Sequence, residues 1–306
     1  MRLILHVGTG KTGTTSVQGF FHRHEQDLGR CGLIYPRAGR TSEKSPAHHA
    51  LGLACFKEIE TQFIKWYEPR YSFRDYADHI RQEIASMPAA IGIVSSEYIA
   101  EPEIPEGRLA EIAAAWHGLS LDVFIVFRQQ RDYLLSSYAQ HVWSARADAR
   151  APLDFLKIHE DLGFFDYDAR LRKFENVFGQ EHVWFSWYET IRADLIKPFE
   201  QLSALQLGSG TGTAGRANRR LSWPTSKGLR ASHRLLGNRN PLRRYARLVD
   251  EAVPPRMRDW LDNTFAPYSE AELEGLDARW EPTNRALAAR RTQLGATAAT
   301  ASAHHP

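Results

Sequence analysis

The sequence has little cysteine, little net charge and no long apolar run, and each of these absences narrows the class of protein. Cys31 and Cys55 are the only two cysteines among 306 residues, and they form neither a disulfide framework nor a metal-ligand spacing. The formal net charge of +3 argues against a general nucleic-acid binder. No apolar stretch reaches the length of a membrane span, and no signal peptide precedes the first apolar run. We therefore expect a soluble cytoplasmic protein with reduced thiols and no transmembrane segment.

The sequence does contain a regular alternation of apolar runs and amphipathic stretches over residues 1–190. Short apolar runs predict buried strands, and apolar residues at a spacing of three to four predict helices. Strands are expected at residues 3–7, 32–36, 89–94, 121–127 and 183–187, and helices at 16–29, 50–56, 73–84, 106–117, 131–144 and 167–178. This alternation predicts an α/β fold with a central parallel sheet flanked by helices on both sides.

The chain changes character after residue 190, where no further strand is evident and the pattern becomes helical. A glycine-rich stretch at about 208–217 predicts a mobile loop, and residues 293–306 have the composition of a disordered, low-complexity tail. Residues 1–292 are expected to form a single α/β domain with a helical C-terminal third. The stretch from Lys227 to Arg247 is basic and contains no acidic residue. It is either a solvated helical face or a surface that attracts an anionic nucleotide or acceptor.

The first strand leads directly into a loop rich in glycine and hydroxyl groups. Residues 8–15 read GTGKTGTT, and a helix is expected from Ser16 onward. A loop between a strand and a helix start presents backbone N–H groups beside the positive end of the helix dipole, and a lysine adds a full charge. We predict a phosphate-binding loop made by the residues Gly10, Lys11, Thr12, Gly13, Thr14, Thr15 and Ser16.

This loop is not a Walker A motif. That motif requires a glycine five residues before the Gly-Lys pair, and Leu5 occupies this position, inside the first strand. The run Lys-Thr-Gly-Thr-Thr-Ser at residues 11–16 instead resembles the 5′-phosphosulfate loop of sulfotransferases that use 3′-phosphoadenosine 5′-phosphosulfate (PAPS).

Two later segments resemble the same family. Arg128 ends a predicted strand, and Ser136 follows eight residues later, as in the 3′-phosphate segment of these enzymes. The usual Asn-Pro after the arginine is replaced here by Gln129-Gln130. Tyr188, after the last predicted strand, resembles the tyrosine that lies near the adenine. The resemblance covers three motifs within about residues 1–190.

The resemblance implies a three-layer, P-loop-like fold of the bacterial, carbohydrate-sulfotransferase type. It also implies PAPS as co-substrate, 3′-phosphoadenosine 5′-phosphate (PAP) as product, no metal, and a role for Lys11 at the leaving phosphate. The implied acceptor is a carbohydrate or another small molecule, and nothing predicts a nucleic-acid partner.

Sulfuryl transfer also needs a base, and the sequence offers three candidates. They are Glu97, after the predicted strand at 89–94, and the adjacent pair His48 and His49; the family uses either glutamate or histidine. We favour a histidine of this pair, because a histidine accepts a proton readily near pH 7 whereas an ionised glutamate beside Lys11 would be a weak base. Glu97 then orients Lys11 or the acceptor.

The favoured function is sulfuryl transfer from PAPS to a hydroxyl of a carbohydrate or glycosylated acceptor. A P-loop kinase or NTPase is the alternative enzyme, but it requires a magnesium-binding aspartate after a central strand, where this chain has Glu97 and Arg128. A non-catalytic PAP-binding protein is the third possibility, and the lysine in the loop counts against it.

Overall fold

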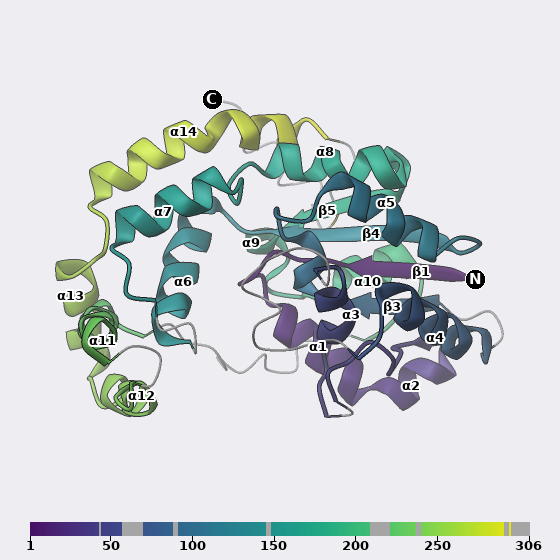
Figure 1. Cartoon of the computed structure of the whole chain (residues 1–306), viewed down its shortest axis with the longest axis horizontal. Helices are drawn as coiled ribbons and strands as arrows, with labels where there is room; N and C mark the ends of the chain where they lie inside the picture. Colours follow the sequence, from purple (N-terminus) through teal and green to yellow (C-terminus); the bar gives the residue numbers. More distant parts are fainter. Residues whose placement is uncertain are drawn as a thin grey trace. The chain divides into compact units, whose positions relative to one another are not determined.

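The computed structural model describes residues 1–42, 44–56, 70–87, 91–144, 148–208, 221–236, 240–290 and 294. They belong to two compact units (Figure 1). The α/β unit comprises Met1–Gln129, Asp166–Ala214 and Thr283–Pro306, and the helical unit comprises Gln130–Phe165 and Gly215–Pro282. The grouping of residues 1–292 into one domain stays a prediction.

The α/β unit is built on a parallel sheet in which the described residues form five strands. Their order is β2-β3-β1-β4-β5, so the first strand of the chain lies at the centre. The strands are β1 (Arg2–His6), β2 (Leu33–Ile34), β3 (Ile91–Ser95), β4 (Ser120–Phe127) and β5 (Val183–Trp187). The predicted parallel sheet is confirmed, with residues 89 and 90 of its third run outside the described residues.

Alternate residues of the strands enter two different hydrophobic cores. In β1, Leu3 and Leu5 belong to one core and Ile4 to the other. In β4, Val123 and Ile125 likewise join the first core while the residue between them joins the second. Successive side chains of a strand point to opposite faces, so both faces of the sheet are covered and its central strands are apolar on both sides.

Helices form the outer two layers of this three-layer, P-loop-like fold. The first core includes residues of α3 (His49–Ala54), α4 (Phe73–Ala85), α5 (Glu106–Ala115) and α8 (Tyr167–Phe178). The second includes residues of α1 (Thr14–Arg23), α2 (Glu25–Arg30), α9 (Tyr188–Ile191) and α10 (Lys197–Ser203). Two short 3₁₀ turns, η1 (Glu97–Ala100) and η2 (Gln180–His182), flank the strands. The predicted flanking of the sheet by helices on both sides is confirmed.

The helical unit packs around a separate aromatic core. Its helices are α6 (Gln130–Trp143), α7 (Pro152–Asp161), α11 (Trp223–Leu236), α12 (Arg243–Glu251), α13 (Pro255–Thr264) and most of α14 (Glu270–Ala288). Tyr138, Phe155 and Trp223 lie in this core. Helix α7 was not expected from the sequence, although Pro152 at its first turn favours a helix start. The described residues after 190 contain helices and no strand, as predicted.

Two predicted features fall largely outside the described residues. Of the glycine-rich stretch at 208–217, only Gly208 is described. Of the tail at 293–306, only Leu294 is described, and it is held by β5: its backbone N–H donates to the Phe185 carbonyl at 2.7 Å, and Ser186 Oγ donates to its carbonyl at 2.7 Å. Within the parts of the chain described here, no helix is long and apolar enough to cross a membrane.

Candidate functional site

The loop after β1 is held in place by bonds to β4 and by its own side chains. The backbone N–H groups of Val7 and Thr9 donate to carbonyls of β4 at 2.9 and 3.0 Å. Thr9 Oγ1 also donates to Val126 O at 3.1 Å, and Thr12 Oγ1 donates to Thr9 O at 2.5 Å. Thr12 is buried, so its hydroxyl proton stabilises the loop rather than facing a ligand.

Two residues of this loop adopt the left-handed backbone conformation. Gly13, at the N-terminal end of α1, has φ of 78°, and a side chain there would also collide with Leu195, because its Cβ would lie 2.8 Å from Leu195 Cδ1. Lys11 has φ of 68° although it is not a glycine. Such strain persists where the surrounding structure imposes it and is concentrated at functional sites.

Arg128 joins the loop from the end of β4. Its Nη1 donates to the carbonyl oxygen of Lys11 at 3.2 Å, and its guanidinium carbon lies 5.4 Å from the centroid of the Tyr188 ring. That ring also borders the loop, because a Cβ added to Gly13 would lie 3.2 Å from Tyr188 Cε2. Four predicted site residues from three strand ends therefore lie together: Lys11, Gly13, Arg128 and Tyr188.

The electrostatics of this cluster favour an anion. Burial lowers the pKa of Lys11, and the nearby charge of Arg128 lowers it further. The backbone N–H groups of Thr14 and Thr15 lie in the first turn of α1, at the positive end of the helix dipole. The side chain of Thr15 is exposed and that of Ser16 is half-buried. An anion between the lysine and the arginine would relieve their repulsion. Gly10 completes the loop, with open space where a side chain would be.

Glu189 supports this cluster, and its role was missed from the sequence. Its carboxylate accepts the backbone N–H of Gln129 at 3.3 and 3.4 Å and lies 3.9 Å from Arg128 Nε. The carboxylate therefore fixes the turn that follows β4 and orients the arginine. Ser136 belongs to α6 in the helical unit, so the predicted pairing of Arg128 with Ser136 stays a prediction.

A second polar cluster lies where β3 ends. Glu97 begins η1, and its Oε1 lies 3.9 Å from Nε2 of His49 on α3. Both side chains are 24% exposed, so solvent or a ligand reaches them. His49 Nδ1 is buried without a hydrogen-bond partner among the described residues. Gln18 of α1 donates through Nε2 to Glu97 Oε2 and to Ser95 Oγ, both at 3.2 Å.

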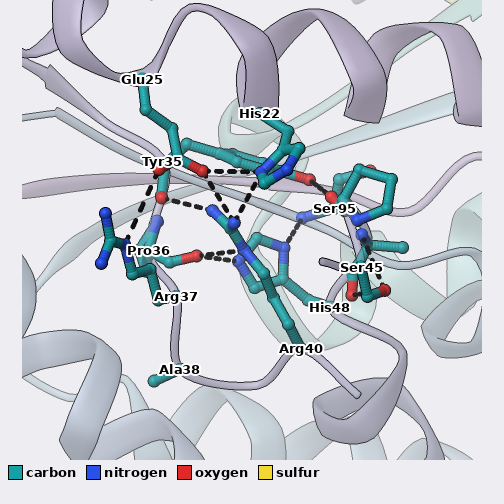
Figure 2. A network of polar contacts seen from close by, with 12 residues as sticks. His22, Glu25, Tyr35, Pro36, Arg37, Ala38, Arg40, Ser45, His48 and Ser95 are labelled. Carbon is teal, nitrogen blue, oxygen red and sulfur yellow. Dashed lines mark hydrogen bonds and ion pairs between the residues drawn. The ribbon is translucent and has the colours of Figure 1, made fainter. Parts of the chain in front are cut away.

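His48 has a structural role instead (Figure 2). Its ring is fully buried, its Nδ1 accepts the backbone N–H of Ser95 at 3.1 Å, and its Nε2 donates to Pro36 O at 2.9 Å. Burial lowers the pKa of His48 to about 3. A buried ring with both nitrogens engaged has no free position for a substrate proton, which argues against His48 as the base.

Arg40 holds the segment around His48 to the rest of the α/β unit (Figure 2). Its guanidinium is buried, donates to Tyr35 O at 2.8 Å and to Pro36 O at 2.9 Å, and pairs with Glu25 of α2 at 2.7 Å. These charged hydrogen bonds satisfy the carbonyl groups of the two residues that follow β2. Because His48 is bonded to Pro36 as well, this network fixes the start of α3 and thereby the position of His49.

His6, the last residue of β1, is a site neighbour that sequence reasoning missed. Its ring is buried against Phe124 and Phe199, and its Nδ1 lies 2.9 Å from Ser95 Oγ. Its Nε2 has no partner among the described residues, and burial lowers the pKa of His6 to about 3. The available signal was a histidine directly after the apolar run Leu3-Ile4-Leu5 of the central strand, since a buried polar side chain requires a partner or a function.

Comparisons with known proteins add only a weak likeness. No family model matches the chain, and no curated protein matches it. Among solved structures, the chain is similar to the crystal structure of a sulfotransferase from Alicyclobacillus acidocaldarius, with 17% identity and a TM-score of 0.45. The similarity covers 92% of this chain and 99% of that one. At this level no residue role is transferred from one chain to the other.

The buried histidines His6 and His48 predict a loss of stability in mild acid. The unfolded chain binds protons at these rings near pH 6.5, whereas the folded protein does so only near pH 3. The unfolded state therefore binds more protons between these values, and stability falls as pH falls from 6.5 toward 3, by at most about 1.4 kcal/mol per pH unit for each ring.

Urea unfolding between pH 4.5 and 7.5 measures this slope. His48→Gln should be less stable at pH 7.5 but should show a shallower slope, while His117→Gln, at an exposed histidine, should leave the slope unchanged. Equal slopes in wild type and His48→Gln would show that His48 does not contribute to acid destabilisation.

Proposed function

We propose that the protein transfers a sulfuryl group from PAPS to a hydroxyl group of a carbohydrate or another small acceptor. The observation that carries this proposal is the convergence of Lys11 and Arg128 at the loop after β1, where a strained backbone, a helix start and two cations favour phosphate groups. Residues 11–16 resemble the phosphosulfate loop of PAPS-dependent enzymes, and this resemblance supports PAPS as the anion that binds here.

Each residue of the cluster has a role in this proposal. The loop and Lys11 hold the 5′-phosphate, Arg128 and Ser136 bind the 3′-phosphate, and Tyr188 contacts the adenine. In the reaction, a bond forms between the acceptor oxygen and sulfur while the bond from sulfur to the bridging oxygen of the 5′-phosphate breaks. PAP leaves with that electron pair, and Lys11 compensates the growing negative charge. The acceptor proton passes to a base.

We assign the base to His49, with Glu97 as its partner. The two side chains lie 3.9 Å apart and are partly exposed, while His48 is buried and engaged on both nitrogens. Gln18 donates to Glu97 Oε2, while Oε1 of the same carboxylate lies nearest the His49 imidazole. An imidazole with a carboxylate neighbour accepts a proton and is stabilised once charged.

The geometry favours transfer of a sulfuryl group over the alternatives. A P-loop kinase or NTPase needs an aspartate for magnesium at the end of a central strand, and the ends of β3 and β4 carry Glu97 and Arg128. A non-catalytic PAP-binding protein has no need of a partly exposed histidine and carboxylate beside the loop.

The protein should distinguish PAP from adenosine 5′-monophosphate. We expect calorimetry to show PAP binding at least tenfold tighter, because a charged hydrogen bond to the 3′-phosphate contributes about 1.5–3 kcal/mol. Arg128→Gln should remove most of this preference, whereas Arg23→Gln at the exposed end of α1 should keep it. Equal affinity of the wild type for both nucleotides would exclude recognition of a 3′-phosphate.

Lys11→Ala should reduce turnover more than it weakens PAP binding. The lysine matters most when charge builds on the leaving phosphate, so its removal should act on the transition state. The measurement compares kcat with the dissociation constant of PAP, with Lys44→Ala at an exposed lysine as control. A variant that loses affinity for PAP but keeps its kcat would contradict the role in catalysis.

His49→Ala should lower kcat by about 10²–10⁴, the usual contribution of a general base, with PAP binding unchanged. Glu97→Gln should cost less, because the carboxylate acts through the imidazole. The assay requires an acceptor, found by screening sugars with labelled PAPS. Near-normal turnover of His49→Ala together with an inactive Glu97→Gln would reverse the two assignments.

A further inference from the structure

The helical unit contains a pocket of its own, about 230 Å³ in volume. Its wall comes from α6, α11 and the segment that follows α13, including Tyr138, Trp223, Phe265, Lys227, Arg230 and Ser226. All of these residues belong to the helical unit, and none of the residues predicted to bind the 5′-phosphate lines this pocket. Ligand pockets for drug-sized molecules measure about 300–1,000 Å³, and this smaller volume suits one ring rather than a chain of them.

Aromatic rings make up much of the wall. Tyr138 and Trp223 are buried, with ring centroids 6.4 Å apart, and Phe265 is 39% exposed. Flat aromatic faces at the edge of a pocket offer apolar contact to the C–H faces of a ring at little entropic cost. The exposed Phe265 is held in place by Lys227, whose Nζ lies 5.6 Å from its ring centroid.

Two cations, Lys227 and Arg230, line the pocket, and the described residues of its wall include no carboxylate. Arg230 Nη1 donates to Tyr138 Oη at 2.9 Å, which leaves further guanidinium N–H groups of its fork for a ligand. Paired cations beside an apolar wall favour a carboxylate or sulfate group.

The buried hydroxyl group of Ser226 is the observation that favours a ligand-binding site over a mere surface depression. Its side chain is 2% exposed, lines the pocket and has an Oγ with no hydrogen-bond partner among the described residues. A buried hydroxyl without a partner costs about 1–3 kcal/mol, and native structures keep such groups where a ligand or another partner satisfies them. Thr264 Oγ1, bonded to Trp260 O at 2.8 Å, adds an acceptor to the same wall.

We propose that this pocket binds a single sugar ring that carries a carboxylate or sulfate group. The aromatic side chains contact the face of the ring, Lys227 and Arg230 bind its anionic group, and Ser226 bonds to a ring hydroxyl. An aromatic acid would use the cations and the aromatic wall but would leave the Ser226 hydroxyl without a partner. In this proposal, the first two basic residues of the stretch from Lys227 to Arg247 bind the anionic group of the ligand.

The test uses the full-length protein and four probes in calorimetry: D-glucuronate, D-glucose 6-sulfate, D-glucose and benzoate. The two acidic sugars should bind at least tenfold tighter than glucose, which lacks the charged contact, and tighter than benzoate, which has no hydroxyl for Ser226. Binding should persist in Lys11→Ala, because that lysine is not among the residues that line the pocket.

Three variants decide whether binding occurs in this pocket. Arg230→Gln should weaken glucuronate at least tenfold, and Ala266→Trp should block the pocket from an exposed position on its wall. Arg234→Gln is the matched control, one turn further along α11 with the same change in charge, and its Nε bonds to Ala149 O instead. Thermal unfolding confirms that each variant is folded.

Several outcomes would overturn the proposal. No binding of either acidic sugar at 10 mM, equal binding of glucose, or tighter binding of benzoate would each exclude an acidic sugar as the ligand. An equal loss of affinity in Arg234→Gln would show attraction to the general charge of α11. Failure of sulfuryl transfer with binding intact would count against the proposed function and leave this inference standing.

Discussion

The hydrogen bond from Arg128 to the carbonyl oxygen of Lys11 is the contact on which the proposed active site depends. It joins the loop after the central strand to the end of the neighbouring strand and brings two positive charges together. In the folded protein the partial charge of one backbone carbonyl and the Glu189 carboxylate offset part of that repulsion. Burial, and after it the remaining repulsion from Arg128, lowers the pKa of Lys11, and a phosphate group beside the lysine would stabilise its charged form.

The rest of the α/β unit makes this contact possible. Because β1 is central and both of its faces are buried, its end cannot move without disturbing two hydrophobic cores. The same rigidity extends to the second cluster through Ser95 at the end of β3. Ser95 contacts His6, His48 and Gln18, so the loop region and the Glu97 region are parts of one buried polar network.

The sequence predicted the sheet and its neighbours because apolar runs bounded by polar turns leave few choices for a parallel sheet. It also predicted that Lys11, Arg128 and Tyr188 follow strands, and these residues meet because parallel strands end at one edge. The sequence could not separate His48 from His49. Adjacent residues at the start of a helix point in different directions, and only the fold shows which ring is buried. Gln18 and Glu189 were missed because long-range hydrogen bonds leave no local pattern.

The bond between Leu294 and β5 has a consequence for the outer edge of the sheet. β5 is the last strand in the order β2-β3-β1-β4-β5, and an uncovered edge strand is a template on which another chain can add. By bonding to Phe185 and Ser186, the chain near its C-terminal end occupies part of that template. One residue of a segment with the composition of a disordered tail therefore covers part of this edge and leaves less of it open to another strand.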